Sequence, residues 1–327
     1  MNIVLPHWLP HLNSTIVRFL IHAGRRLTIG FAACLAPAWT ARRLAARFVT
    51  PPHVAHTPLE QRAIRSGLAY RIATPMGTLA AWQFGKADRP AIVFSHGWGG
   101  RGAQFREFVL TLLDAGYQVW LFDHVGHGLS DGHEAPITDF AAGLSAVVRH
   151  VQAGGIEVVG LVGHSLGCAA IGLALRGTLR SLRDVSVVQI APPASLIRYS
   201  RHFARRLGVP ERIRAAMQRR LEQRTGIAWQ QLEMPQAVAS LQVRALIVHD
   251  EHDRDVGIES GLAVARAWPD ARFKRTSGLG HRRILRAPAV IAAVCDFIAD
   301  RVIFARAPAV DAWTPMFPSV AGVTPLY

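Results

Sequence analysis

Residues 158–170 read VVGLVGHSLGCAA, and this stretch decides the fold. Its first part, Val158–Val162, is a continuous apolar run of the kind that forms a strand buried on both faces of a sheet. The pentapeptide Gly163-His164-Ser165-Leu166-Gly167 follows, and small residues suited to a helix come next. A G-x-S-x-G in this setting is typical of a sharp strand-to-helix turn that strains its serine and leaves no room for a Cβ at either glycine. Ser165 is therefore the candidate nucleophile.

Apolar runs on both sides of this turn continue the same pattern along the chain. The expected strands are Leu68–Ala73, Thr78–Phe84, Ala91–Ser95, Gln118–Phe122, Val158–Gly163, Val185–Ile190, Arg244–His249 and Arg272–Thr276. The expected helices are Gln104–Leu113, Phe140–Val151, Leu166–Leu175, Ser260–Trp268 and Ala287–Ile303. Because strands and helices alternate, the sequence predicts the α/β class with a doubly wound, mainly parallel sheet.

A glycine-rich loop follows the expected strand at Ala91–Ser95. It reads His96-Gly97-Trp98-Gly99-Gly100. A loop of this composition at the end of a strand lets backbone N–H groups point at a developing oxyanion. The backbone amides of Trp98 and Leu166 are the predicted oxyanion donors.

An acid and a base stand downstream of the serine. The expected strand Arg244–His249 runs into a segment that holds Asp250, Asp253 and Asp255, and His281 follows the next strand. A serine nucleophile needs an imidazole to take its proton, and the imidazole needs a carboxylate that fixes its tautomer. We predict a Ser165–His281–Asp253 triad, with Asp250 and Asp255 as rivals for the acid.

These motifs resemble those of α/β-hydrolase-fold serine hydrolases with a helical cap, similar to esterases, lipases and thioesterases, over roughly residues 68–303. The chain order serine, acid, histidine is the order of that family. The resemblance implies that Asp253 holds the acid's position and that Asp123–Ser130 shapes a turn rather than performing chemistry. Ser165 argues against the dehalogenases and epoxide hydrolases of this fold, which carry an aspartate at the same turn.

The pattern of apolar runs and breaks along the chain suggests a division into segments, and for the cap alone the resemblance implies the same position. We expect an N-terminal helical arm at residues 1–60, an α/β-hydrolase core at residues 61–191 and 236–304, and a C-terminal tail at 305–327. Between the two parts of the core, residues 192–235 are expected to form a helical cap insertion. In that segment Ile213, Met217 and Leu221 recur every four residues, so one helix face is apolar.

The N-terminal arm contains an apolar run at Leu27–Trp39 that Pro37 interrupts. The run is too short to cross a bilayer, which takes roughly 20 apolar residues. The arm is expected to pack on the domain; the alternative is that it lies on a membrane surface with Arg42, Arg43 and Arg47 near the headgroups. A peripheral membrane contact would then involve residues 1–50.

The formal charge of the 327-residue chain is +15, and 35 of its 37 basic residues are arginines. They are spread along the sequence without a nucleic-acid-binding motif, so no nucleic-acid partner is expected. The three cysteines are far apart and favour a reducing compartment, which predicts a cytoplasmic protein. We expect no cofactor and no metal, because His124, His127, Asp131 and His133 lack the spacing of a metallo-hydrolase.

The predicted function is cleavage of a small-molecule carboxylic ester or thioester by serine catalysis. An acyltransferase would use the same triad, and a non-catalytic binding module would keep only the fold. Nine arginines between Arg198 and Arg224 would suit an anionic substrate if they faced the site, although a solvated helix face is the favoured interpretation.

Overall fold

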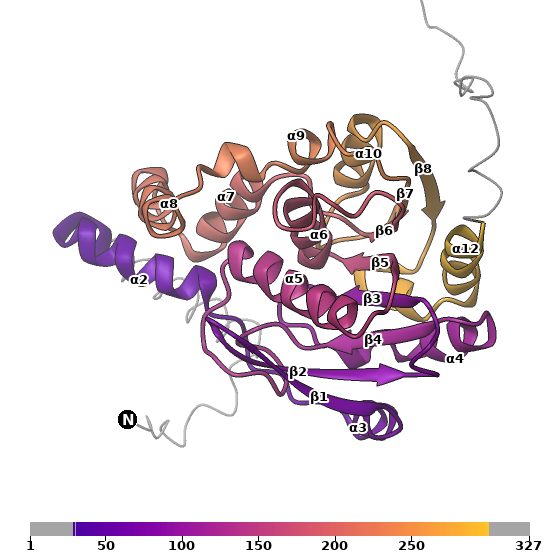
Figure 1. Cartoon of the computed structure of the whole chain (residues 1–327). Helices are drawn as coiled ribbons and strands as arrows, with labels where there is room; N and C mark the ends of the chain where they lie inside the picture. Colours follow the sequence, from indigo (N-terminus) through magenta and orange to yellow (C-terminus); the bar gives the residue numbers. More distant parts are fainter. Residues whose placement is uncertain (1–28, 30, 301–327) are drawn as a thin grey trace, which may run out of the picture.

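A computed structural model describes residue 29 and residues 31–300 of the chain. Its centre is one eight-stranded sheet with the strand order β1-β2-β4-β3-β5-β6-β7-β8 (Figure 1). The strands are β1 (Leu68–Thr74), β2 (Gly77–Phe84), β3 (Ala91–Ser95), β4 (Gln118–Phe122), β5 (Val158–His164), β6 (Ser186–Ile190), β7 (Ala245–Asp250) and β8 (Ala271–Thr276). All eight expected strands are present within two residues of their predicted ends.

The sheet is parallel from β4 to β8, and β2 pairs antiparallel with both β1 and β4. Every residue of β3, β4, β5, β6 and β7 is buried, as expected for parallel strands that are covered on both faces. The prediction of a doubly wound, mainly parallel sheet is confirmed.

Two sets of helices cover the two faces of the sheet (Figure 1). One face carries α5 (Ile137–Ala153), α6 (Leu166–Arg176), α9 (Met234–Val238) and α10 (Ile258–Ala267). The other face carries α3 (Pro58–Arg65), α4 (Arg106–Asp114) and α12 (Pro288–Ala299). The carboxyl ends of the central parallel strands lie along one edge of the sheet, between the two helical layers. Ligands of open α/β sheets bind in the crevice outside such carboxyl ends.

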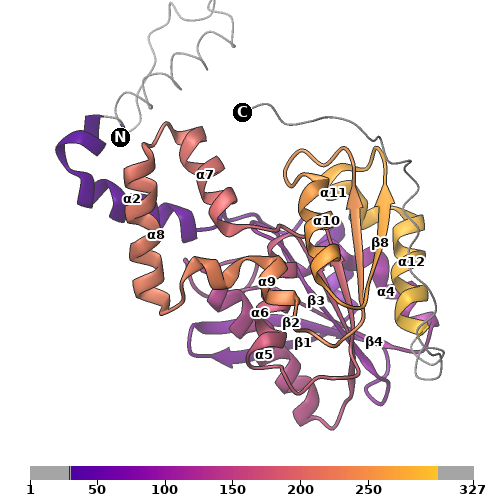
Figure 2. The same cartoon turned by 90° about the horizontal axis from the view of Figure 1, so that it is seen from above.

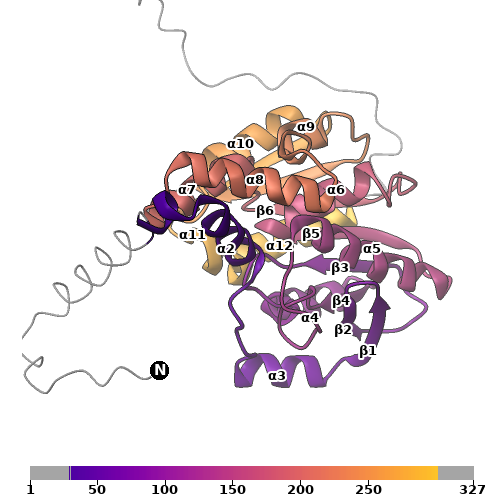
Figure 3. The same ribbon diagram turned by 90° about the vertical axis from the view of Figure 1, so that its left-hand side faces the viewer.

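A third layer lies beyond those ends. It consists of α2 (Pro37–Val49), α7 (Leu196–Leu207), α8 (Glu211–Thr225) and the short helix η3 (Trp229–Leu232), which share one apolar cluster. Figures 2 and 3 show α2 against α8, with α7 next to them. Ile213, Met217 and Leu221 of α8 are buried in this cluster. Their spacing along the sequence therefore marks the face of α8 that packs on α2.

The division into arm, core, cap and tail stays a prediction. The predicted cap contains α7, α8 and η3, and the helical stretch continues past residue 235 to the end of α9. The predicted tail and residues 1–28 lie outside the described residues. Within the described part of the chain, no helix is long and apolar enough to cross a membrane.

Candidate active site

Ser165 lies at the turn between β5 and α6. Its φ of 53° and ψ of −121° place a residue with a side chain in a region that favours glycine, so the predicted strain is present. A Cβ on Gly163 would lie 2.8 Å from the Cys168 amide nitrogen, and one on Gly167 would overlap the carbonyl oxygen of Ser95. Both glycines are therefore needed for the close approach of α6 to the sheet, as the sequence predicted.

His281 lies in the short helix α11 (Gly280–Arg283), which follows β8. Its Nδ1 is 2.7 Å from Oδ2 of Asp253, which stands after β7. The other carboxylate oxygen of Asp253 accepts hydrogen bonds of 2.9 Å from the amides of Asp255 and Val256. These bonds hold the carboxylate in place, so that it orients the imidazole.

The charge of Asp253 is stabilised in its buried position. Burial alone would raise the pKa of this carboxyl, but the neighbouring ring of His249 and hydrogen bonds from His281 and the Val256 amide hold the pKa well below its usual range. The buried ring of His249 is 3.6 Å from Asp253 Oδ2 and is anchored by its contact of 2.8 Å with the Val256 carbonyl. Asp253 is therefore an anion over the whole range in which an imidazole titrates.

In the described part of the chain, neither rival carboxylate forms a hydrogen bond or an ion pair with the imidazole of His281. Asp250 is fully buried and accepts hydrogen bonds from the amides of Leu279 and Gly280 and from the Thr276 hydroxyl. It thereby anchors the loop that carries His281. The side chain of Asp255 is exposed and its amide donates to Asp253.

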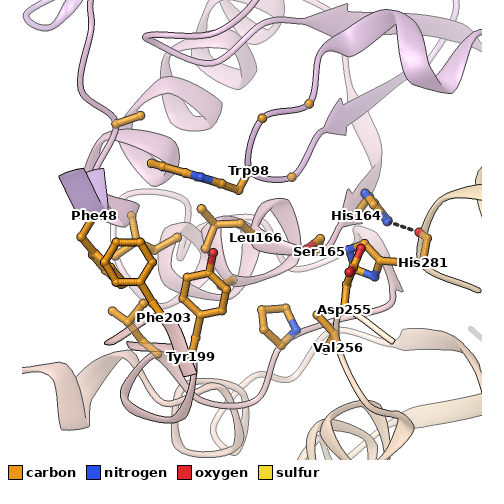
Figure 4. Close-up of a pocket in the computed structure, with 18 of the residues that line it drawn as sticks. Phe48, Trp98, His164, Ser165, Leu166, Tyr199, Phe203, Asp255, Val256 and His281 are labelled. Carbon is orange, nitrogen blue, oxygen red and sulfur yellow. Dashed lines mark hydrogen bonds between the residues drawn. The ribbon is translucent and has the colours of Figure 1, made fainter. Parts of the chain in front are cut away.

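Ser165 and His281 line the same cavity, and Figure 4 shows them next to each other. Nε2 of His164 is 2.8 Å from the backbone oxygen of His281, and the two rings are 4.7 Å apart. Burial lowers the pKa of His164 to about 3, so the ring is neutral and donates its Nε2 proton to that carbonyl. The residue before the serine thus ties the histidine loop to the turn.

The glycine-rich loop after β3 lies directly on this turn. A Cβ on Gly97 would lie 2.8 Å from the Cβ of Ser165, so only a glycine allows the loop backbone to come this close. The next residue, Trp98, lines the cavity on the same side as Leu166, the first residue of α6 (Figure 4). Their role as oxyanion donors remains a prediction.

Buried histidines form hydrogen bonds that hold the glycine-rich loop after β3 in place. The Gly99 amide donates to Nε2 of His127 over 3.1 Å, and the His124 amide donates to Nε2 of His96 over 2.9 Å. Burial lowers the pKa of His127 to about 4 and that of His96 well below its usual value, so both rings are neutral acceptors. Among the described residues, no cluster of three or more His, Cys, Asp or Glu could hold a metal ion.

The cavity has a volume of about 600 Å³ and extends from the Ser165–His281 pair toward the third helical layer. Of the nine arginines between Arg198 and Arg224, all in the described chain, only Arg206 lines it. The segment therefore contributes to the wall of the site, but eight of its nine arginines do not. The apolar lining residues that come from the third helical layer include Phe48, Leu196, Tyr199, Phe203, Leu221 and Trp229.

Several of these residues are not marked by any pattern in the sequence. Phe48, Tyr199, Phe203 and Trp229 meet only in the folded chain, and no local pattern marks them. Asp250 is a candidate acid on the basis of the sequence, but the sequence does not predict its anchoring role. Its hydrogen-bond partners lie at the end of β8 and in the segment after it, and no spacing in the sequence indicates them.

Comparison with known proteins agrees with this geometry. The sequence model of the family described as alpha/beta hydrolase fold matches residues 90–176. Human monoglyceride lipase is 32% identical over 92 residues, which are 27% of this chain and 30% of that protein. A non-heme haloperoxidase of Rhodococcus erythropolis is 34% identical over 110 residues, or 32% of this chain and 39% of that protein. The chain thus spans less than half the length of these relatives.

The solved structures extend the likeness over most of the chain. Est1E from Butyrivibrio proteoclasticus, with ferulic acid bound, superposes with a TM-score of 0.58 at 19% identity and covers 72% of this chain and all of its own. At 19% identity the superposition shows a shared fold and nothing further. Taken with the sheet order and the family match, it shows that the chain is an α/β-hydrolase-fold protein that resembles esterases and lipases.

Proposed function

We propose that the chain is a serine hydrolase that cleaves carboxylic esters or thioesters through an acyl-enzyme on Ser165. The observation that carries this proposal is the 2.7 Å contact of the buried Asp253 with His281, which lines the same cavity as the strained Ser165. A buried carboxylate, an imidazole and a serine on a tight turn are the groups that nucleophilic acyl transfer requires.

In the first half-reaction, Oγ of Ser165 attacks the acyl carbon while Nε2 of His281 takes the hydroxyl proton. Asp253 stays ionised and stabilises the imidazolium that forms. The amides of Trp98 and Leu166 donate to the oxyanion of the tetrahedral intermediate. The imidazolium then gives its proton to the oxygen or sulfur of the leaving group as the bond to the acyl carbon breaks.

In the second half-reaction, water takes the place of the leaving group. His281 accepts a proton from the water as its oxygen attacks the acyl-enzyme, and then returns that proton to Oγ of Ser165 as the acid leaves. If an alcohol entered in place of water, the same steps would make the protein an acyltransferase. Adding candidate alcohols to the assay and measuring the transfer product distinguishes the two reactions.

The test is the activity of Ser165→Ala on p-nitrophenyl acyl esters. We expect kcat to fall by about 10³-fold or more, because the covalent route is lost. Ser66→Ala, at an exposed serine remote from the cavity, is the matched control and should leave the rate unchanged. A Ser165→Ala protein that folds normally and keeps most of its activity would contradict the proposal.

A further inference from the structure

The wall of the cavity farthest from His281 is aromatic and comes partly from the N-terminal helix α2. Phe48 of α2 stacks on Trp229 at a centroid distance of 5.5 Å and meets Phe203 edge-on at 5.2 Å. The ring of Tyr199 is 5.9 Å away. In Figure 4, Phe48 and Phe203 lie at one end of the cavity, His281 lies at the other, and Ser165 is between them.

Phe48 is held on a fixed support. Ala41, Leu44, Ala45 and Val49 of α2 are buried in the cluster that α2 shares with α8. The carbonyl oxygen of Val49 also accepts a hydrogen bond of 2.7 Å from the Ala135 amide, so the end of the helix that carries Phe48 is tied to the core. A side chain supported in this way can act as a wall.

The position of His281 relative to Ser165 determines which part of a bound substrate contacts this aromatic wall. His281 must give a proton to the leaving group, so the leaving group lies on the side of His281. The acyl group then extends from Ser165 in the opposite direction, past Leu166 and toward Phe48. That direction is mainly aromatic and apolar, with His202 and Arg206 of α7 as polar members of its lining. Near His281 the lining instead includes Arg254, Arg282 and Arg286.

We propose that Phe48 closes the acyl end of the cavity and sets the longest acyl chain that the enzyme accepts. This inference rests on the proposed esterase function. Burial of each further methylene is expected to raise kcat/KM about fourfold, until the chain reaches the aromatic wall. Beyond that length an added methylene has no space, and kcat/KM stops rising.

The experiment compares kcat/KM for esters of one alcohol with acyl chains from two to sixteen carbons. In Phe48→Ala the length at which kcat/KM stops rising should increase by several carbons, and the ratio of the dodecanoyl to the butanoyl ester should rise on the order of tenfold. In Phe48→Trp that length should decrease. Trp39→Ala is the matched control, because Trp39 is an exposed aromatic residue of the same helix that does not line the cavity.

A second series keeps the acyl group constant and lengthens the alcohol. The inference is overturned if Phe48→Ala changes the profile of this series instead, or if its acyl profile equals those of the wild type and Trp39→Ala. If Phe48→Ala fails to fold, as judged by circular dichroism, Phe48→Leu and Phe48→Trp provide the same comparison. A wild-type protein that hydrolyses no ester would instead refute the proposed function, so the two failures are distinguishable.

Discussion

At the scale of single residues, the two carboxylate oxygens of Asp253 make different contacts. Oδ2 contacts the imidazole of His281, and Oδ1 accepts from two backbone amides, so the carboxylate cannot rotate without losing hydrogen bonds. Asp255 is two residues away and lines the cavity, yet only its backbone takes part in this arrangement. The carboxylate of Asp253, the proposed acid, therefore differs from that of Asp255 both in the amides that hold it and in its contact with His281.

This difference predicts unequal effects of two isosteric substitutions. Asp253→Asn should lower kcat by about 10³-fold or more, because an amide neither fixes the correct imidazole tautomer nor stabilises the imidazolium. Asp255→Asn, which leaves the backbone donor in place, should change kcat by no more than a few-fold. Steady-state rates on one p-nitrophenyl ester measure both variants, and equal losses in the two would refute the assignment of the acid.

At the scale of elements, the loop after β3 depends on the loop after β4. The Gly99 amide donates to Nε2 of His127, whose Nδ1 is 2.9 Å from the Val125 carbonyl. The ring can serve both partners only when it is neutral, with its proton on Nδ1. Protonation of Nε2 would replace the acceptor of Gly99 with a second donor.

The stability of this arrangement should therefore depend on pH. Burial lowers the pKa of His127 from 6.5 to about 4, so the unfolded chain binds more protons than the folded one between these values. The stabilising contribution is complete above pH 6.5 and is lost as the pH falls toward 4. Across that interval it amounts to about 3 kcal/mol.

The measurement is urea denaturation of the wild type and of His127→Gln at several values between pH 4 and pH 7. Glutamine does not titrate, and its side-chain oxygen can accept from Gly99. Subtracting the two curves removes the contribution of the other buried histidines. The stability of the wild type relative to the variant should fall with decreasing pH, and a difference that does not change with pH would contradict this account of His127.

At the scale of the whole molecule, the site extends beyond the segment that matches the family. Residues 90–176 supply Ser165, Trp98 and Leu166, whereas α2 and α3 come from the N-terminal part of the chain. Helix α2 contributes Phe48 to the cavity, and Glu60 of α3 lies 2.7 Å from Nε of Arg101, next to the glycine-rich loop. The N-terminal helices thus support both the wall of the cavity and the loop beside it.

Removal of one partner from the ion pair of Glu60 and Arg101 should be strongly destabilising, because both side chains are buried. Glu60→Ala would leave a guanidinium buried without its partner, and we expect a loss of about 3–5 kcal/mol in the free energy of unfolding. Glu134→Ala removes the exposed pair with Arg224 and should cost about 0–1 kcal/mol. Chemical denaturation compares the two variants, and a Glu60→Ala protein as stable as Glu134→Ala would disprove this role.

The features of the fold and site that could be predicted from the sequence are those that depend on local patterns. The turn at Ser165, its two glycines and the alternating strands follow from spacing and hydrophobic runs within a few residues, and the structure confirms them. Phe48 and Glu60 could not be predicted, because their partners are far along the chain and are selected only when helices dock. Contact of residues 1–50 with a membrane stays a prediction, since residues 1–28 lie outside the described part.

The central claim is that Ser165 is a nucleophile activated by His281 and Asp253, and covalent labelling tests it most directly. The full chain is incubated with a fluorophosphonate probe, and the adduct is located by mass spectrometry of peptides. We predict one equivalent of label on Ser165, none in Ser165→Ala and much slower labelling in His281→Ala. Label that persists in a folded Ser165→Ala protein, or a wild type that takes up none, would contradict the account.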